Sequence, residues 1–229
     1  MERGILMEHT LNPIKPLKRY TLGEEIFNSV SHGVGALLGV IGTVVLIVLS
    51  AVNGSSLALG TSIVYGLSLV MLYTMSTLYH AIVAQRAKEI LRIFDHTSIF
   101  LLIAGSYTPF CLVALEGNPR GLMVAAIVWL CAIAGIILNA VSLKKTEKIG
   151  MVLYVVMGWS VIMVIKDVVA ALPAPGFWLL LLGGLSYTGG IAFYAIKKKY
   201  MHSIWHLFVL AGSVLHYLCI AIYVLPMAY

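Results

Sequence analysis

The segment HSIWHLFVLAGSVLHYLCIAIYVLP, residues 202–226, decides the fold, because it is an apolar run with histidines along one side. At 3.6 residues per turn, His202 and His206 stack on one face of a helix, and Ser213 and His216 fall within about a turn's width of the same line. The other residues of the segment suit lipid or a buried neighbour. We therefore expect a membrane helix whose imidazoles face the protein interior.

The composition places the rest of the chain in a membrane as well. Of 229 residues, 61% are hydrophobic and 10% are charged, whereas charged residues make up about 25% of a soluble domain. We expect an all-α integral membrane protein, with a cytoplasmic tail at residues 1–24 and one transmembrane domain at residues 25–229. The tail has no long apolar core, which argues against a cleavable signal peptide. Three cysteines without CxxC spacing argue against a disulfide framework or a thiolate metal site.

Seven apolar segments are long enough to cross a bilayer core, which takes roughly 20 residues. Helix is the only structure open to them, because isolated strands cannot satisfy their backbones in lipid. The pattern predicts a seven-helix bundle, with a kink at Pro109 and an outer turn at Pro173 and Pro175. The segments are residues 26–52, 57–83, 91–115, 121–143, 150–172, 176–196 and 203–225.

The basic residues predict the orientation of this bundle. Thirteen of the 15 Lys and Arg residues lie in the tail and in the loops expected at residues 84–92, 144–148 and 197–199. Those segments fall on one side of a chain with seven spans, so the N-terminus should be cytoplasmic and the C-terminus outside. A basic excess that sits in short loops between spans argues against nucleic-acid binding.

This topology brings polar residues from distant segments to one depth near the cytoplasmic face. Ser76 and His80 end the second span, Asp95 begins the third, and His202 and His206 begin the seventh. Three neutral imidazoles with an open position describe a catalytic zinc site. Asp95 could accept the proton of the zinc-bound water or align it for attack, and Ser76 could bond that water or a developing oxyanion. A proton or cation path lined by the same residues is the alternative.

Other histidines are expected to have supporting or structural roles. His32, with Ser29 one turn before it, either supports the metal site from a second layer of contacts or bonds a neighbouring helix. His96 points about 100° away from the residue before it and is not expected to be a metal ligand. His216 lies a turn or more deeper in the membrane than the pair that begins its helix, which favours a packing or hydrogen-bonding role.

Four stretches together resemble the hemolysin III proteins of bacteria. This family belongs with the progestin and adiponectin (adipoQ) receptors and, more distantly, with the alkaline ceramidases. The similarity covers nearly the whole chain, including seven spans with the N-terminus inside. The stretches are EEIFNSVSHG (residues 24–33), STLYH (76–80), RIFDHTSI (92–99) and HSIWH (202–206), the last followed by His216.

The resemblance implies a zinc ion held by His80, His202 and His206, with Asp95 and Ser76 close to the metal-bound water, in the inner membrane of a bacterium. It implies a ceramidase-like hydrolase that acts on a lipid amide or ester and takes part in membrane lipid homeostasis. Two alternatives stay open. One is a hemolysin III-type cytolysin or channel with structural zinc, and the other is a non-catalytic membrane sensor that binds lipid between its helices.

Overall fold

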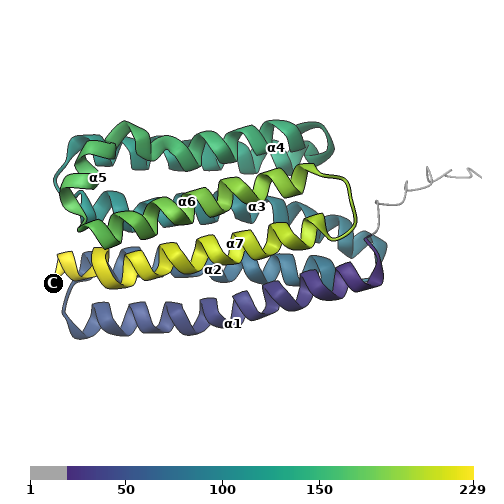
Figure 1. Cartoon of the computed structure of the whole chain (residues 1–229), viewed down its shortest axis with the longest axis horizontal. Coiled ribbons are helices and arrows are strands. Elements are labelled where there is room, and N and C mark those ends of the chain that lie inside the picture. The colour runs from purple at the N-terminus through teal and green to yellow at the C-terminus, as the bar shows by residue number, and fades with distance from the viewer. Residues whose placement is uncertain (1–19) are drawn as a thin grey trace, which may run out of the picture.

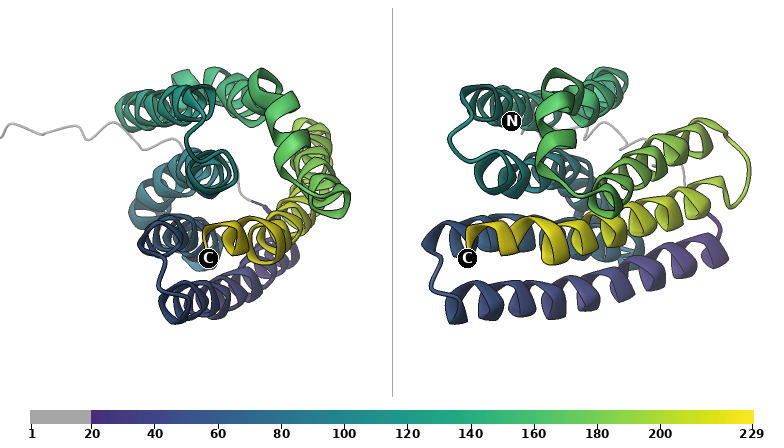
Figure 2. Two further views of the ribbon diagram at one scale, coloured as in Figure 1. Left: turned by 90° about the vertical axis from the view of Figure 1, so that its left-hand side faces the viewer. Right: turned by 60° about the vertical axis from the view of Figure 1, so that its left-hand side comes forward.

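The computed structural model describes residues 20–229, and every regular element in that range is helical. The helices lie side by side in one bundle (Figure 1), and the end-on view in Figure 2 shows them arranged in a ring. The expected all-helical fold is thus confirmed for the described residues. The α-helices are α1 (Leu22–Val52), α2 (Ser56–Ala81), α3 (Gln85–Pro109), α4 (Pro119–Gly158), α5 (Ile165–Ala171), α6 (Ala174–Ala195) and α7 (Met201–Cys219).

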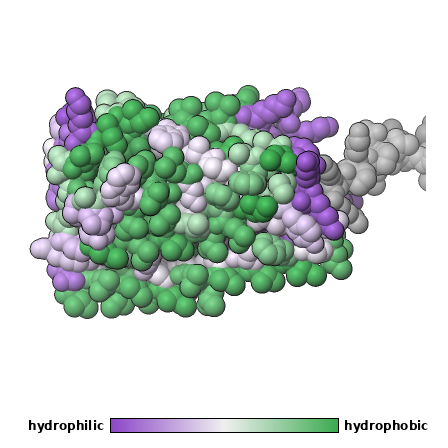
Figure 3. Space-filling model, in the orientation of Figure 1, coloured by the Kyte–Doolittle hydropathy of each residue, from purple (hydrophilic) through white to green (hydrophobic). Residues whose placement is uncertain are grey.

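The surface of the bundle is that of a membrane protein. Within residues 20–229, six helices are long and apolar enough to cross a membrane. Figure 3 shows one face of the molecule, where hydrophobic side chains cover the middle and hydrophilic ones gather toward the two ends. One of the six, Pro119–Ala171, has 53 residues. If straight it would be about 80 Å long, far more than the roughly 30 Å of a bilayer core.

That long helix doubles back on itself at Ser142, whose φ of −164° and ψ of 81° are not helical. The Thr146 hydroxyl donates to the Leu138 carbonyl at 3.3 Å, although eight residues of straight helix would separate them by about 12 Å along the axis. At the other end, the Arg120 guanidinium donates to the Asp167 carboxylate at 2.8 Å. The two arms on either side of Ser142 are therefore antiparallel.

Several boundaries differ from the sequence prediction. Helix α3 begins at Gln85 rather than at residue 91, so most of the loop expected at residues 84–92 is helical. Helix α1 begins at Leu22 rather than at residue 26, because Thr21 and Glu24 form a capping box; residues 1–19 of the expected tail lie outside the described residues. The basic stretch 144–148 is helical rather than a loop, because the reversal needs only one non-helical residue. Pro109 ends the regular hydrogen bonding of α3, and a π-helical turn, Phe110–Ala114, follows it.

Buried contacts across the centre of the bundle align α1, α2, α6 and α7. Gly35 of α1 faces the ring of Tyr73, and a Cβ at that glycine would lie 2.5 Å from the ring. The Tyr73 hydroxyl donates to Ser213 Oγ at 2.7 Å, and the Tyr187 hydroxyl meets the same oxygen at 2.8 Å. Hydrogen bonds between buried hydroxyls are strong because the surroundings have a low dielectric constant. They therefore oppose sliding of one helix past the next.

The start of α7 is fixed by a contact with α1. Tyr200 precedes α7 with a φ of 63°, a left-handed conformation that a bulky residue rarely adopts. Its backbone N–H donates to Glu24 Oε1 at 2.8 Å. Figure 1 shows that the beginning of α1 and the connection between α6 and α7 lie at the same end of the bundle, opposite the C-terminus. This contact joins the residue before α7 to the first turn of α1.

Candidate metal centre

Three imidazoles from distant parts of the chain meet at this end of the bundle. His80 comes from the last turn of α2, and His202 and His206 come from the first two turns of α7. One ring nitrogen from each lies within 4.8 Å of the other two. His80 and His206 are buried, with 2% and 1% of their surface exposed. Three imidazole donors at these separations could hold one metal ion.

The ring nitrogens are placed so that one bound cation could take up their lone pairs. His202 Nε2 and His206 Nε2 face each other at 3.1 Å, and two imidazole nitrogens on one tetrahedral zinc stand roughly 3.3 Å apart. His80 donates its Nδ1 proton to Glu25 Oε2 over 2.7 Å, so its Nε2 carries a lone pair. That buried Nε2 has no hydrogen-bond partner among residues 20–229. A buried acceptor without a partner is costly, and a bound cation would satisfy it.

A small cavity adjoins the histidines and holds the two other residues that the sequence singled out. Its volume is about 40 Å³, and its lining includes Ser76, Asp95, His202 and His206. Since one water needs about 10–15 Å³ of such space, the cavity has room for a reacting water. Ser76 of α2 is 1% exposed, so this hydroxyl is shielded from bulk solvent. The cavity thus combines a carboxylate, a hydroxyl and two candidate ligands.

Tyr20 covers the imidazoles from the side where the described chain begins. Its ring stacks on His202 with centroids 4.8 Å apart and planes 20° from parallel, and it lies 5.6 Å from the ring of His80. Burial raises the pKa of the Tyr20 phenol above its ordinary range, so the hydroxyl stays protonated at neutral pH. Tyr194 lies on another side of His202, with ring centroids 5.6 Å apart, and its hydroxyl donates to Glu147 at 2.9 Å. These two tyrosines limit the access of solvent to the imidazoles at this end of the bundle.

The two residues predicted to support the site lie at different distances from it. The ring of His32 stacks on that of His206 with centroids 3.6 Å apart, and His32 also lines the small cavity. Ser29 instead donates to the backbone carbonyl of Thr77, one turn before His80, over a long 3.4 Å. Its contact is with the backbone of α2, and its supporting role stays a prediction.

His96 and His216 complete the set of histidines in the described chain. His96 lines the small cavity together with Asp95, and its carbonyl accepts a hydrogen bond from the Tyr154 hydroxyl at 2.7 Å. His216 hydrogen-bonds through Nε2 to the Leu180 carbonyl at 3.1 Å. The hydrogen-bonding role expected for His216 therefore agrees with the structure.

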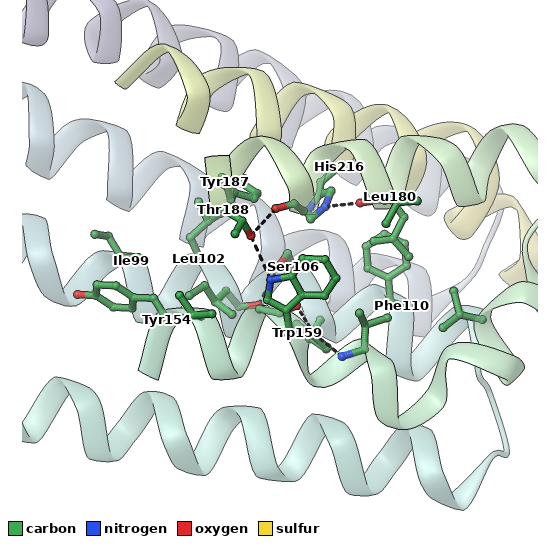
Figure 4. A pocket seen from close by; sticks show the side chains of 18 of the residues that line it. Ile99, Leu102, Ser106, Phe110, Tyr154, Trp159, Leu180, Tyr187, Thr188 and His216 are labelled. Atoms are coloured by element: carbon green, nitrogen blue, oxygen red, sulfur yellow. Dashed lines mark hydrogen bonds between the residues drawn. The ribbon is translucent and has the colours of Figure 1, made fainter. Parts of the chain in front are cut away.

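A second, larger cavity shares part of its lining with the first, and Figure 4 shows side chains that line it, among them Tyr154, Trp159 and His216. Its volume is about 150 Å³, and most of its lining is apolar. One side is lined by α6 and the other by the chain between Tyr154 and Val168, where the Trp159 indole donates to Thr188 Oγ1 at 3.1 Å. Both cavities share six lining residues, Leu72, Ile99, Tyr154, Ile191, Trp205 and Val209.

Comparison with known proteins identifies the family. A profile of the family described as "Haemolysin-III related" matches residues 20–217. The chain belongs to this family. It is 42% identical over 206 residues to "Hemolysin-3" of Bacillus cereus, covering 90% of this chain and 94% of that protein. It is 41% identical over 205 residues to the "Hemolysin-3 homolog" of Bacillus subtilis (strain 168), covering 89% and 96%.

A more distant similarity links this haemolysin-III-related protein to an animal protein. It is 28% identical over 167 residues to the human "Monocyte to macrophage differentiation factor", covering 70% of this chain and 68% of that protein. That protein is a member of the progestin and adipoQ receptor family. The resemblance to hemolysin III proteins and their kinship with these receptors is confirmed. The chain is accordingly a multi-pass membrane protein.

Sequence reasoning missed three residues of the site in this haemolysin-III-related protein. Glu25 bonds the ring of His80, Lys88 pairs with Glu25 at 2.8 Å, and Tyr20 covers the imidazoles. One available signal was the position of Glu25, which lies one and two helical turns before Ser29 and His32 on the same side of α1. Lys88 and Tyr20 lie in segments whose path only the tertiary structure defines.

Proposed function

We propose that this protein is a zinc-dependent membrane hydrolase that acts on a lipid amide or ester. The observation that carries the proposal is the meeting of His80, His202 and His206 beside a cavity that contains Asp95 and Ser76. Neither an accumulation of apolar residues nor a structural helix contact requires three imidazoles to meet in one place, two of them buried and one with an Nε2 that has no partner in the described chain.

Zinc is the metal that this donor set suits best. All three donors are imidazole nitrogens, which are borderline ligands well suited to zinc, and three protein ligands leave one position open as in catalytic zinc sites. The carboxylate of Glu25 on His80 adds the outer contact that zinc-binding histidines usually make.

The residues around the histidines have the properties that hydrolysis requires. Zinc, when bound, supplies a Lewis acid and lowers the pKa of a water that it holds. The Asp95 carboxylate, which lines the same cavity as His202 and His206, accepts a proton from the attacking water. The Ser76 hydroxyl donates to the substrate carbonyl oxygen as negative charge develops there. Tyr20 excludes cytoplasmic water from this chemistry by stacking over the imidazoles.

The larger cavity supports a substrate with an apolar tail. Its roughly 150 Å³ is comparable to a cavity that binds a molecule of benzene size, so it would hold part of an acyl chain. The remainder of the chain would extend into the bilayer between α6 and the arm that faces it, where the hydrogen bond from the Trp159 indole to Thr188 Oγ1 joins the two segments. The head group would then lie at the smaller cavity, next to the histidines.

We also propose seven crossings with the N-terminus in the cytoplasm of a bacterial cell and the protein in its inner membrane. The reversal at Ser142 divides the 53-residue helix into two arms, and the basic residues cluster at alternate connections. A cysteine introduced at Lys198 should react with an impermeant thiol reagent only from the cytoplasmic side. Labelling from outside would contradict this orientation.

The catalytic proposal is tested with purified protein in detergent or liposomes. Wild-type protein should contain about one zinc per chain and release fatty acid from ceramides or lipid esters. Asp95→Asn should keep its zinc and lose turnover by about 100-fold or more, as for removal of a general base. Zinc-free wild-type protein with its fold intact, or equal turnover in Asp95→Asn, would reject the proposal.

The printed names of the relatives from Bacillus favour a second candidate, a cytolysin in which the metal is structural. This function predicts leakage of dye from liposomes that contain the wild-type protein. Because a structural metal needs no general base, Asp95→Asn should leak as fast as wild type. Leakage with unchanged rate in that variant, without lipid turnover in either protein, would favour the cytolysin.

A further inference from the structure

We propose that Glu25, itself held by Lys88, is a positioning residue that fixes the tautomer and orientation of His80 and thereby sets the metal affinity of the site. The inference rests on the proposed metal centre and adds to it a residue that acts on a metal ligand and does not itself bind the metal. It concerns two charged side chains at the border between α1, α2 and α3.

The three side chains form one continuous line of short contacts. His80 Nδ1 lies 2.7 Å from Glu25 Oε2, and Lys88 Nζ lies 2.8 Å from Glu25 Oε1. Each carboxylate oxygen therefore has its own partner. The side chains of His80, Lys88 and Glu25 are 0%, 8% and 15% exposed, so these contacts are largely shielded from water, which strengthens them.

The chemistry of a carboxylate determines the tautomer of His80. An ionised carboxylate can only accept hydrogen bonds, so His80 Nδ1 must carry the proton of this pair. A neutral ring then has its lone pair on Nε2, the atom that is buried without a partner in the described chain. Such a carboxylate contact also raises the basicity of a ligating imidazole. Glu25 thus prepares His80 for a cation before any cation arrives.

Lys88 holds the carboxylate in place and is itself held by α2. Its Nζ donates to the carbonyls of Tyr79 at 3.0 Å and Ile82 at 3.4 Å. These carbonyls lie at the C-terminal end of α2, where a cation is favoured by unsatisfied carbonyls and by the helix dipole. The residue is 7% exposed. Its ammonium contacts three oxygens, one from the Glu25 carboxylate and two from these carbonyls. A lysine on α3 therefore locks a carboxylate on α1 onto the histidine of α2.

The adjacent residue Glu24 provides a matched control within the same turn of α1. Its carboxylate bonds the Thr21 hydroxyl at 2.7 Å and the Tyr200 N–H at 2.8 Å. In Glu24→Gln the amide oxygen can still accept from the Tyr200 N–H, so the start of α7 keeps this contact, and no imidazole contact is lost. A variant at Glu24 consequently measures the effect of losing a buried carboxylate from this turn, separately from the orientation of His80.

The experiment compares full-length wild type, Glu25→Gln, Lys88→Met and Glu24→Gln, purified in detergent. Zinc dissociation constants are measured by competition with a chromophoric chelator, and unfolding temperatures are measured without zinc. We expect Glu25→Gln to weaken zinc binding by about 10–100-fold, the usual effect of losing an outer contact of a zinc ligand. Lys88→Met should weaken it less, and Glu24→Gln should leave it unchanged. With cobalt(II) in place of zinc, only the Glu25 and Lys88 variants should shift the visible absorption bands.

Different outcomes reject different parts of the scheme. Wild-type affinity in Glu25→Gln, or an equal loss of affinity in Glu24→Gln, would overturn the positioning role and leave the proposed hydrolase standing. Zinc binding by the wild type without any lipid turnover would reject the hydrolase and leave the positioning role testable by the same titration. A wild type that is folded and binds no zinc would reject both.

Discussion

Helix α7 carries His206 and His216 ten residues apart, and the two imidazoles lie in different chemical surroundings. His206 meets the rings of His202, His32 and His80 at one end of the bundle. His216 lies beside the apolar cavity, where its Nε2 bonds the Leu180 carbonyl and its ring contacts Phe110 and Tyr187 edge-on. One helix thus contributes to a polar cluster and to an apolar wall.

The difference shows that the number of histidines does not by itself identify a metal site. At the first position, three rings contribute nitrogens to one small space, and the Nε2 of His80 is left over after the hydrogen bonds of the described chain are counted. At the second position, a single ring uses its Nε2 on a backbone carbonyl, and its Nδ1, which also lacks a partner in the described chain, belongs to no group of imidazoles there. Lone pairs that converge, rather than imidazoles that are merely buried, indicate a bound cation.

Removing one member of the cluster should have the largest effect. His206→Ala removes a proposed metal ligand and is expected to weaken zinc binding by more than about 100-fold. The loss of a hydrogen bond that only orients a ligand usually weakens binding by about 10–100-fold, and the loss of the ligand itself should weaken it more. His216→Ala, on the same helix, should retain zinc. Metal content after dialysis, and the rise in unfolding temperature on adding zinc, measure the difference. Equal zinc content in the two variants would remove the distinction between the two ends of α7.

Filling the apolar cavity should have an intermediate effect and leave the metal in place. Gly184 lines this cavity, and a Cβ there would have open space around it. Gly184→Leu should lower kcat/KM for long-chain lipids by about 10-fold, the scale on which a pocket discriminates small changes in fit. Gly60→Leu is the control, since that glycine is exposed on α2 and also faces open space. Equal kinetics in both variants would show that lipid does not use the cavity.

The smallest effect is expected at His216 itself. His216→Phe keeps an aromatic ring but loses the hydrogen bond to the Leu180 carbonyl, which should cost about 1 kcal/mol of stability. For a chain of this size that corresponds to a fall of roughly 2–4 °C in unfolding temperature. Zinc content and turnover should equal those of the wild type. Loss of zinc in this variant would show that the metal centre depends on His216 as well.

The elements of the fold were largely predictable, because a bilayer demands long apolar segments and helical backbones. The turn at Pro173 and the interruption at Pro109 also followed from the missing N–H of proline. The basic stretch 144–148 was expected to be a loop and is helical, since composition does not reveal how abruptly a chain can reverse. Helical periodicity places residues on a face, and it does not say which neighbour that face meets.

The same distinction holds for the candidate site. The spacing of His202 and His206, and the depth that they share with His80, Ser76 and Asp95, could be derived from the order of the spans. Glu25 was visible at the right depth, but its role was not, because a carboxylate beside an imidazole has no signature in sequence spacing. The contact depends on the rotation of α1 about its axis, which the packing of Gly35 on Tyr73 determines.

The sequence by itself determined a helical membrane protein in which His80, His202 and His206 gather at one end, since hydrophobic length, charge bias and helical period are local properties. Only the tertiary structure decided that the ring nitrogens of His80, His202 and His206 come within 4.8 Å of one another, that Glu25 and Lys88 hold His80, and that the small cavity beside the histidines shares part of its lining with a larger apolar one. The physical reason is that these features depend on the rotation and tilt of separate helices, which are set by side-chain packing between segments far apart in the sequence.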